Sequence, residues 1–135
     1  MPTVPAYDTY DYAVIRVVPR VEREEFVNVG VVVSCPARGF LEARIELDPA
    51  RVLTLDPGAD IDTIYAHLAS IPVICRGGAA AGAIGQLSPG ERFRWLTSPR
   101  STVIQFSAAH TGRCEDPEAL LARLVETMVR SPSAD

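Results

Sequence analysis

A valine-rich stretch, Glu24–Cys35, constrains the fold of this chain more than any other part of it. Its centre is a β-branched run that lacks the spacing of an amphipathic helix, which predicts a strand buried on at least one face. Strand side chains alternate between two faces. The predicted core face consists of Val27, Val29, Val31, Val33 and Cys35. The opposite face consists of Asn28, Gly30, Val32 and Ser34. Its amide, glycine and hydroxyl make this second face the place where we expect a functional site.

Length and composition predict a single globular domain. The chain has 135 residues, of which 47% are hydrophobic and 22% charged, as is usual for a folded domain with one core. Its formal charge of -4 disfavours a general nucleic-acid binder, whose surface is usually basic. All 13 basic residues are arginine, which excludes lysine chemistry such as a Schiff base.

The cysteines and the apolar runs further limit the class of protein to which this chain can belong. Cys35, Cys75 and Cys114 are far apart and form no CxxC pair, so we expect neither a disulfide framework nor a zinc site. We also expect no cofactor. The first five residues have no charged start and no apolar stretch, and no apolar run approaches the roughly 18 residues of a membrane helix. We therefore expect a cytoplasmic protein without a membrane segment.

The remaining pattern predicts an α+β fold. Besides the valine strand, strands are predicted at 10–19, 40–47, 91–97 and 102–108. Asp60 and the Asp116-Pro117 pair are typical N-caps and precede helices with buried stripes. We predict a single domain over 7–130 with the order β-β-β-α-β-β-α, and flexible termini at 1–6 and 131–135. About five strands would form a mainly antiparallel sheet, with two main helices packed on one face.

Strand parity places a charged group beside the polar face. If the first two strands form an antiparallel hairpin, Ala13, Ile15 and Val17 share the face of the valines, and Arg16 lies on the side of Asn28. We expect Arg16 opposite or diagonal to Gly30, where a glycine leaves room for a guanidinium. Glu25 either folds back to hold this group or belongs to a solvated charge run.

Catalytic motifs are scarce. His67 and His110 are not linked by any motif, which disfavours a histidine metal site, and no GxSxG nucleophile motif occurs. Arginine forks bind carboxylates and phosphates well, and Tyr12 or Trp95 could add stacking surfaces. The four arginines that could converge on one face are Arg16, Arg92, Arg94 and Arg100. The alternative is that Arg92 and Arg94 simply form the solvated face of the predicted strand at 91–97.

Several motifs resemble one bacterial family, the domain of unknown function 3037. The first is Tyr10-x-Tyr12-x-x-x-Arg16-x-x-Pro19, followed by Glu25-Phe26-x-Asn28-Val29-Gly30-Val31. The later ones are Phe93-x-Trp95-Leu96 and Asp116-Pro117-Glu118, before a helix that ends near Met128. The resemblance implies no activity. It implies importance for Arg16, Glu25, Asn28 and Gly30, and it implies a HipA-like kinase as a partner.

Three hypotheses follow. The first is a non-catalytic protein-binding or accessory module that acts through the sheet face around Arg16. The second is an enzyme or ligand-binding domain for an anionic small molecule. The third is a purely structural lock of the first hairpin, and a homodimer through a sheet edge stays open. The candidate binding residues are Tyr12, Arg16, Glu25, Asn28, Gly30 and Arg100.

Overall fold

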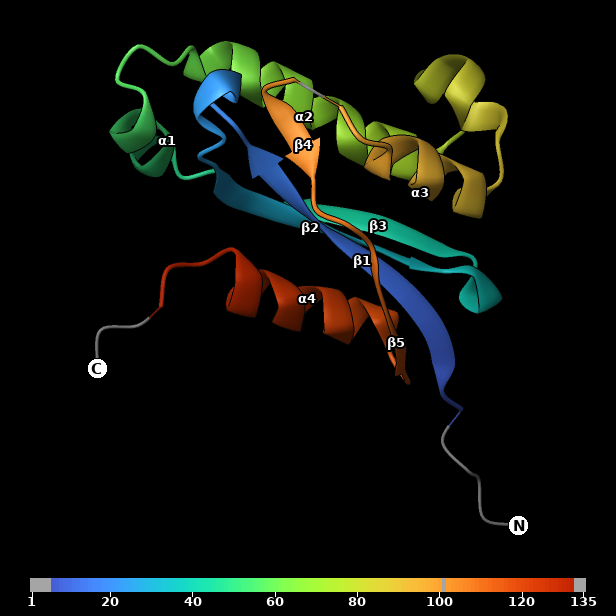
Figure 1. Ribbon diagram of the computed structural model, residues 1–135. Helices are drawn as coiled ribbons and strands as arrows, with labels where there is room; N and C mark the ends of the chain where they lie inside the picture. Colours follow the sequence, from blue (N-terminus) through green and yellow to red (C-terminus); the bar gives the residue numbers. More distant parts are fainter. Residues whose placement is uncertain (1–5, 101, 133–135) are drawn as a thin grey trace.

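The valine-rich stretch forms β2 (Val27–Cys35), a central strand of the sheet. The computed structural model describes residues 6–100 and 102–132. Its other strands are β1 (Asp8–Val17), β3 (Phe40–Ile45), β4 (Ile104–Phe106) and β5 (His110–Cys114). The order is β3-β2-β1, with β4 and β5 following one another along the free edge of β1, and all pairings are antiparallel (Figure 1). The predicted α+β class with a five-stranded sheet is confirmed.

A β-bulge at Val29 changes which valines share a face. Arg16 pairs with Asn28 and Ile15 pairs with Gly30, so Val29 is an extra residue on β2. An extra residue reverses the alternation beyond it. Val27 and Val29 therefore lie in one core and Val31 and Val33 in another. The predicted single valine face is wrong, because the pattern alone does not reveal the bulge.

Helices cover both faces of the sheet (Figure 1). The helices are α1 (Pro49–Leu55), α2 (Ile61–Arg76), α3 (Pro89–Thr97) and α4 (Pro117–Met128). Helices α2 and α3 pack over one face, whose core includes Ile15, Val29 and Leu68. Helix α4 covers the other face at β2 and β3, where Val31 contacts the cluster of Leu121 and its neighbours. The prediction that both main helices share one face is wrong, since the bulge gives the sheet two apolar faces.

The predicted helix caps are confirmed. The Asp60 side chain accepts from Thr63 N at 3.1 Å, and the Asp116 side chain accepts from Glu118 N and Ala119 N. Pro117 stands at the first position of α4. These caps satisfy the backbone donors that a helix start leaves unpaired. They fix the points from which α2 and α4 cross the sheet.

The segment 91–97 is helical, not a strand. Ser88 Oγ accepts from Glu91 N at 3.3 Å, while Glu91 Oε1 accepts from Ser88 N at 3.2 Å. This reciprocal pair is a capping box, and Pro89 at the first helical position supports it. Alternating apolar residues suggested a strand, but the Ser-x-x-Glu signal decides for α3. The predicted strand at 91–97 is therefore wrong.

The last two strands extend one edge of β1. β4 covers three residues of the strand predicted at 102–108, and β5 lies in a stretch for which no strand is predicted. Between them, buried Ser107 continues the pairing: its N donates to Val14 O at 2.9 Å and its Oγ accepts from Val14 N at 2.8 Å. Within 6–100 and 102–132, no single helix has the length and hydropathy of a membrane span; α2 and the following 3₁₀ segment reach them only as a pair bent by 63°.

Candidate functional site

Arg16 and Asn28 are neighbours on the face that α4 covers. They are directly paired in the β1–β2 ladder, so their side chains project from the same side of the sheet. Asn28 Nδ2 donates to Met128 O at 3.1 Å. The last carbonyls of a helix have no partner within it. The amide therefore caps the C-terminal end of α4 and ties β2 to this helix. This contact differs from the hairpin lock of the third hypothesis.

The Arg16 guanidinium rests on an aromatic ring. Its Cζ lies 4.1 Å from the centroid of the Phe26 ring, which suits a cation–π contact, and Phe26 is 45% exposed. Arg16 Nε and Asn28 Oδ1 are buried and have no hydrogen-bond partner among the described residues. None of the ion pairs between described residues includes Arg16. The pair thus keeps unused hydrogen-bonding capacity beside an exposed ring.

Glu25 and Gly30 lie apart from this pair. Glu25 accepts from Arg23 Nε in the exposed hairpin loop and does not fold back to Arg16. Gly30 faces the α2–α3 side because of the bulge, and so does Ser34. A Cβ on Gly30 would lie 2.6 Å from Arg44 O, so this position needs glycine for the close approach of β2 and β3. The expectation that Gly30 makes room for the guanidinium is corrected.

Tyr12 lies on the α4 side at the other end of β1. Its ring stacks on His110 with the centroids 5.2 Å apart, and it packs against the second core together with Tyr10. His110 is the residue paired with Tyr12 in the β1–β5 ladder. This stack joins a candidate residue to one of the two histidines. Neither Arg16 nor Tyr12 lines any of the five best-formed cavities between described residues.

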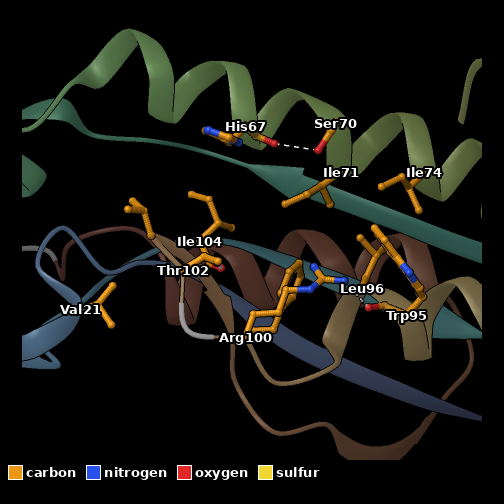
Figure 2. Close-up of a pocket in the computed structure, with 12 residues that line it drawn as sticks. Val21, His67, Ser70, Ile71, Ile74, Trp95, Leu96, Arg100, Thr102 and Ile104 are labelled. Carbon is orange, nitrogen blue, oxygen red and sulfur yellow. Dashed lines mark hydrogen bonds between the residues drawn. The ribbon is translucent and has the colours of Figure 1, made fainter.

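Arg100 lies on the opposite side of the sheet and lines a half-open pocket of about 480 Å³. This cavity, the α2–α3–β4 pocket, lies between those three elements and the loop after α3 (Figure 2). Its lining residues are Val21, His67, Ser70, Ile71, Ile74, Trp95, Leu96, Arg100, Thr102, Val103, Ile104 and Phe106. Most of them are apolar, and α2 supplies one wall while α3 and β4 supply the others. Of the six candidate residues, Arg100 is the one that contributes to a pocket of this size.

The Arg100 side chain is held in place by Trp95. Arg100 Nη2 donates to Trp95 O at 2.7 Å, and Arg100 Cζ lies 4.4 Å from the centroid of the Trp95 ring. In Figure 2 the guanidinium extends from the loop toward Trp95 at one side of the pocket, and His67 lies across from it on α2. The lining contains no Asp or Glu. The pocket therefore presents basic groups on an apolar background.

The other arginines considered for a cluster do not join Arg100. Arg92 is buried, and its guanidinium donates to Leu87 O at 2.6 Å and Cys75 O at 3.2 Å. It links α3 to the end of α2 and so has a structural task. Arg94 is exposed on α3 and does not line the pocket. His67 is exposed on α2 and lines the pocket. Its position four residues before Ile71 is the sequence signal that could place it there.

Metal and thiol chemistry have little support among the described residues. No group of three or more His, Cys, Asp or Glu side chains is arranged to hold a metal ion there. The three cysteines are buried and unpaired. Burial raises the pKa of Cys75 to about 12, which keeps this thiol protonated at neutral pH and unreactive as a nucleophile.

The fold and its sites define a small α+β domain, a sheet between helices with one polar cluster at the end of α4 and one apolar pocket on the other side. The chain belongs to the family described as "Protein of unknown function (DUF3037)", whose family model matches residues 12–129. Comparison with curated proteins and with solved structures finds no significant match. The family description names no activity, so a function has to be argued from the geometry.

Proposed function

We propose that the protein is a non-catalytic accessory module that binds a ligand with an apolar body in the α2–α3–β4 pocket. The observation that carries the proposal is the pocket itself, a half-open cavity of about 480 Å³ with mainly apolar walls. Small-molecule sites are usually concave, apolar cavities of about 300–1,000 Å³ with a few polar groups. Both the size and the character of the lining meet this description.

Exposed apolar side chains at the pocket support a binding role. Trp95 is 38% exposed, and Val21 and Val103 are each 36% exposed. All three line the pocket. Covering such surface with an apolar ligand is favourable, at about 25 cal/mol for each Å² removed from water. A ligand seated between α2 and α3 would therefore stabilise the fold by covering these side chains.

The side chains in the pocket favour binding over catalysis. Among the described residues that line the pocket there is no carboxylate and no cysteine, and His67 is the one histidine. No hydrogen bond between described residues orients the His67 imidazole. General acid–base catalysis relies on a positioned group. We therefore place this protein among accessory modules and regard an enzyme for an anionic substrate as the weaker alternative.

The test uses the single tryptophan of the chain. Because Trp95 forms part of the pocket wall, its emission reports binding of a neutral apolar dye such as Nile red. We expect saturable binding to the native chain and loss of binding in Ser70→Phe, which adds a ring to a lining position. Ala69→Phe is the matched control, since Ala69 is exposed on the same helix and outside the lining. Equal dye binding by both variants would remove the pocket from the proposal.

A protein-binding surface at Arg16 is the second candidate. It is favoured by exposed Phe26 beneath a guanidinium that has no ion-pair partner among the described residues. Arginine and aromatic side chains are common anchors of protein interfaces. The family resemblance makes a HipA-like kinase the first partner to test. Arg16→Ala should weaken capture of such a purified kinase, whereas exposed Arg113→Ala should not, and equal capture by both would exclude this surface.

A further inference from the structure

We propose that the ligand of the α2–α3–β4 pocket is an apolar monocarboxylate whose acid group binds to Arg100. This inference rests on the proposed function and adds the chemical class of the ligand. Three properties of the pocket support it: the state of the Arg100 guanidinium, the distribution of charge around the pocket, and the presence of a single fixed cation beside an apolar wall.

The Arg100 guanidinium is held in place, but most of its N–H donors have no partner among the described residues. A guanidinium has five N–H donors, and within the described residues Arg100 uses one nitrogen, Nη2, to bond Trp95 O at 2.7 Å. Trp95 also covers one face of the group, with Cζ 4.4 Å from the ring centroid. No ion pair between described residues includes Arg100. A fork held in this way loses less freedom when it binds a carboxylate.

The charge around the pocket differs from that of the chain. The whole sequence has 17 acidic and 13 basic residues, yet the pocket is lined by Arg100 and His67 and by no acidic side chain. A cation beside an apolar wall attracts an anion more strongly than it would in open water. The pocket is thus complementary to an acidic ligand on a protein that is acidic as a whole.

The number of fixed cations limits the ligand to one acidic group. Arg100 lies beside Trp95, and the wall formed by Ile71, Ile74 and Phe106 is apolar. A nucleotide or polyphosphate would need several charged donors for its oxygens. Besides Arg100, the polar side chains of the lining include His67, Ser70 and Thr102, and the two hydroxyls already donate to backbone carbonyls. A single carboxylate on an alkyl or aryl body satisfies the guanidinium and covers the wall at the same time.

The experiment compares octanoate with octanol and octylamine, which share a tail and differ in the head group. Binding to the full chain is measured by calorimetry, so that changes near Trp95 do not affect the readout. We expect octanoate to bind about tenfold more tightly than octanol, as a charge-assisted hydrogen bond predicts, and octylamine to bind most weakly. Arg100→Gln should remove the preference for octanoate and leave octanol binding unchanged. Arg94→Gln, on the exposed side of α3, should behave like the native chain.

The outcomes separate the two proposals. Equal affinity of the native chain for octanoate and octanol would overturn acid recognition and leave an apolar pocket. Absence of binding for all three compounds, together with absence of Nile red binding, would overturn the proposed function itself. Arg100→Lys keeps the charge and loses the fork, so we expect it to keep part of the preference. The comparison in the native chain stays decisive even if an Arg100 variant folds poorly.

Discussion

The two faces of the sheet are closed in different ways. Under α4, an aliphatic stripe packs on Val31 and Val33, and polar contacts fasten the end of the helix: Asn28 bonds Met128 O and Arg51 bonds Val129 O at 2.9 Å. On the α2–α3 face, a half-open pocket remains where short β4 faces α2. A polar side chain on a sheet can therefore serve to hold a helix, as Asn28 does at the end of α4. The pocket forms where the side chains of α2 and β4 do not fill the space between these two elements.

The largest expected effect compares the sheet face under α4, here called the sealed face, with the α2–α3 face, which contains the half-open pocket. Leu121 is fully buried under the sheet, and Leu121→Ala should lower the free energy of unfolding by about 2–5 kcal/mol because it leaves a cavity. Ile74→Ala, at the half-buried wall of the pocket, removes atoms that already border open space. We expect a clearly smaller loss. Urea denaturation measures both, and equal losses would contradict the difference between the two faces.

The next effect concerns Gly30, the residue that follows the bulge on β2. A Cβ on Gly30 would lie 2.6 Å from Arg44 O and 3.1 Å from Ile15 Cδ1. Gly30→Ala should therefore cost about 1–3 kcal/mol of stability through overpacking. Gly90→Ala is the control, because this helical glycine has room for a Cβ and should be neutral or stabilising. A stable Gly30→Ala variant would mean that β2 and β3 do not approach so closely.

The third effect concerns the polar contact at the end of α4. Asn28→Ala removes the bond to Met128 O and should cost about 1 kcal/mol. Asn28→Asp should cost more at neutral pH, since a carboxylate cannot donate and lies at the negative end of the helix dipole. The extra loss should shrink in acid, where the new side chain is neutral. Thermal melts at several pH values test this, and equal melts for Ala and Asp would contradict a capping role.

The sequence predicts the parts of this fold that depend on local signals. The three N-terminal strands follow from β-branched alternation, and the starts of α2 and α4 follow from Asp60 and Asp116. Helix α3 also has a local signal, the Ser88-x-x-Glu91 box, which a strand-like alternation in the same segment concealed. In this segment a strand-like alternation competes with a helix-capping signal. The helix forms because the capping box satisfies backbone donors at its start.

The sequence does not predict features that depend on tertiary pairing. The bulge at Val29 is defined by how β2 pairs with β1. No residue type within Val27–Cys35 predicts it. Parity did place Arg16 with Asn28, because both lie between the bulge and the hairpin loop. It failed for Gly30 and Ser34, which follow it. The pocket beside Arg100 also depends on tertiary structure. Its walls come from α2, α3 and β4, and the residue spacing along the chain does not predict how far apart these elements lie.

The smallest expected effect concerns an exposed ion pair beyond the end of α4. Arg130 Nη2 lies 2.7 Å from Glu46 Oε1, and this hydrogen bond lowers the pKa of the Glu46 carboxyl. A carboxyl whose pKa is lower in the folded state stabilises the fold above its ordinary pKa, and the gain is lost as pH falls through the folded value. Exposed pairs contribute no more than about 1 kcal/mol. Glu46→Gln should therefore be slightly less stable than the native chain at neutral pH.

That difference should disappear in acid and shrink in concentrated salt, because both conditions weaken the ion pair. Urea denaturation of the two chains across pH supplies the measurement. If Glu46→Gln matches the native chain at every pH, the end of α4 is held by the Asn28 and Arg51 contacts alone. If the difference persists in acid, Glu46 contributes by packing and not by charge. In either case the sealed face depends chiefly on buried apolar contacts, and its polar contacts set where α4 ends.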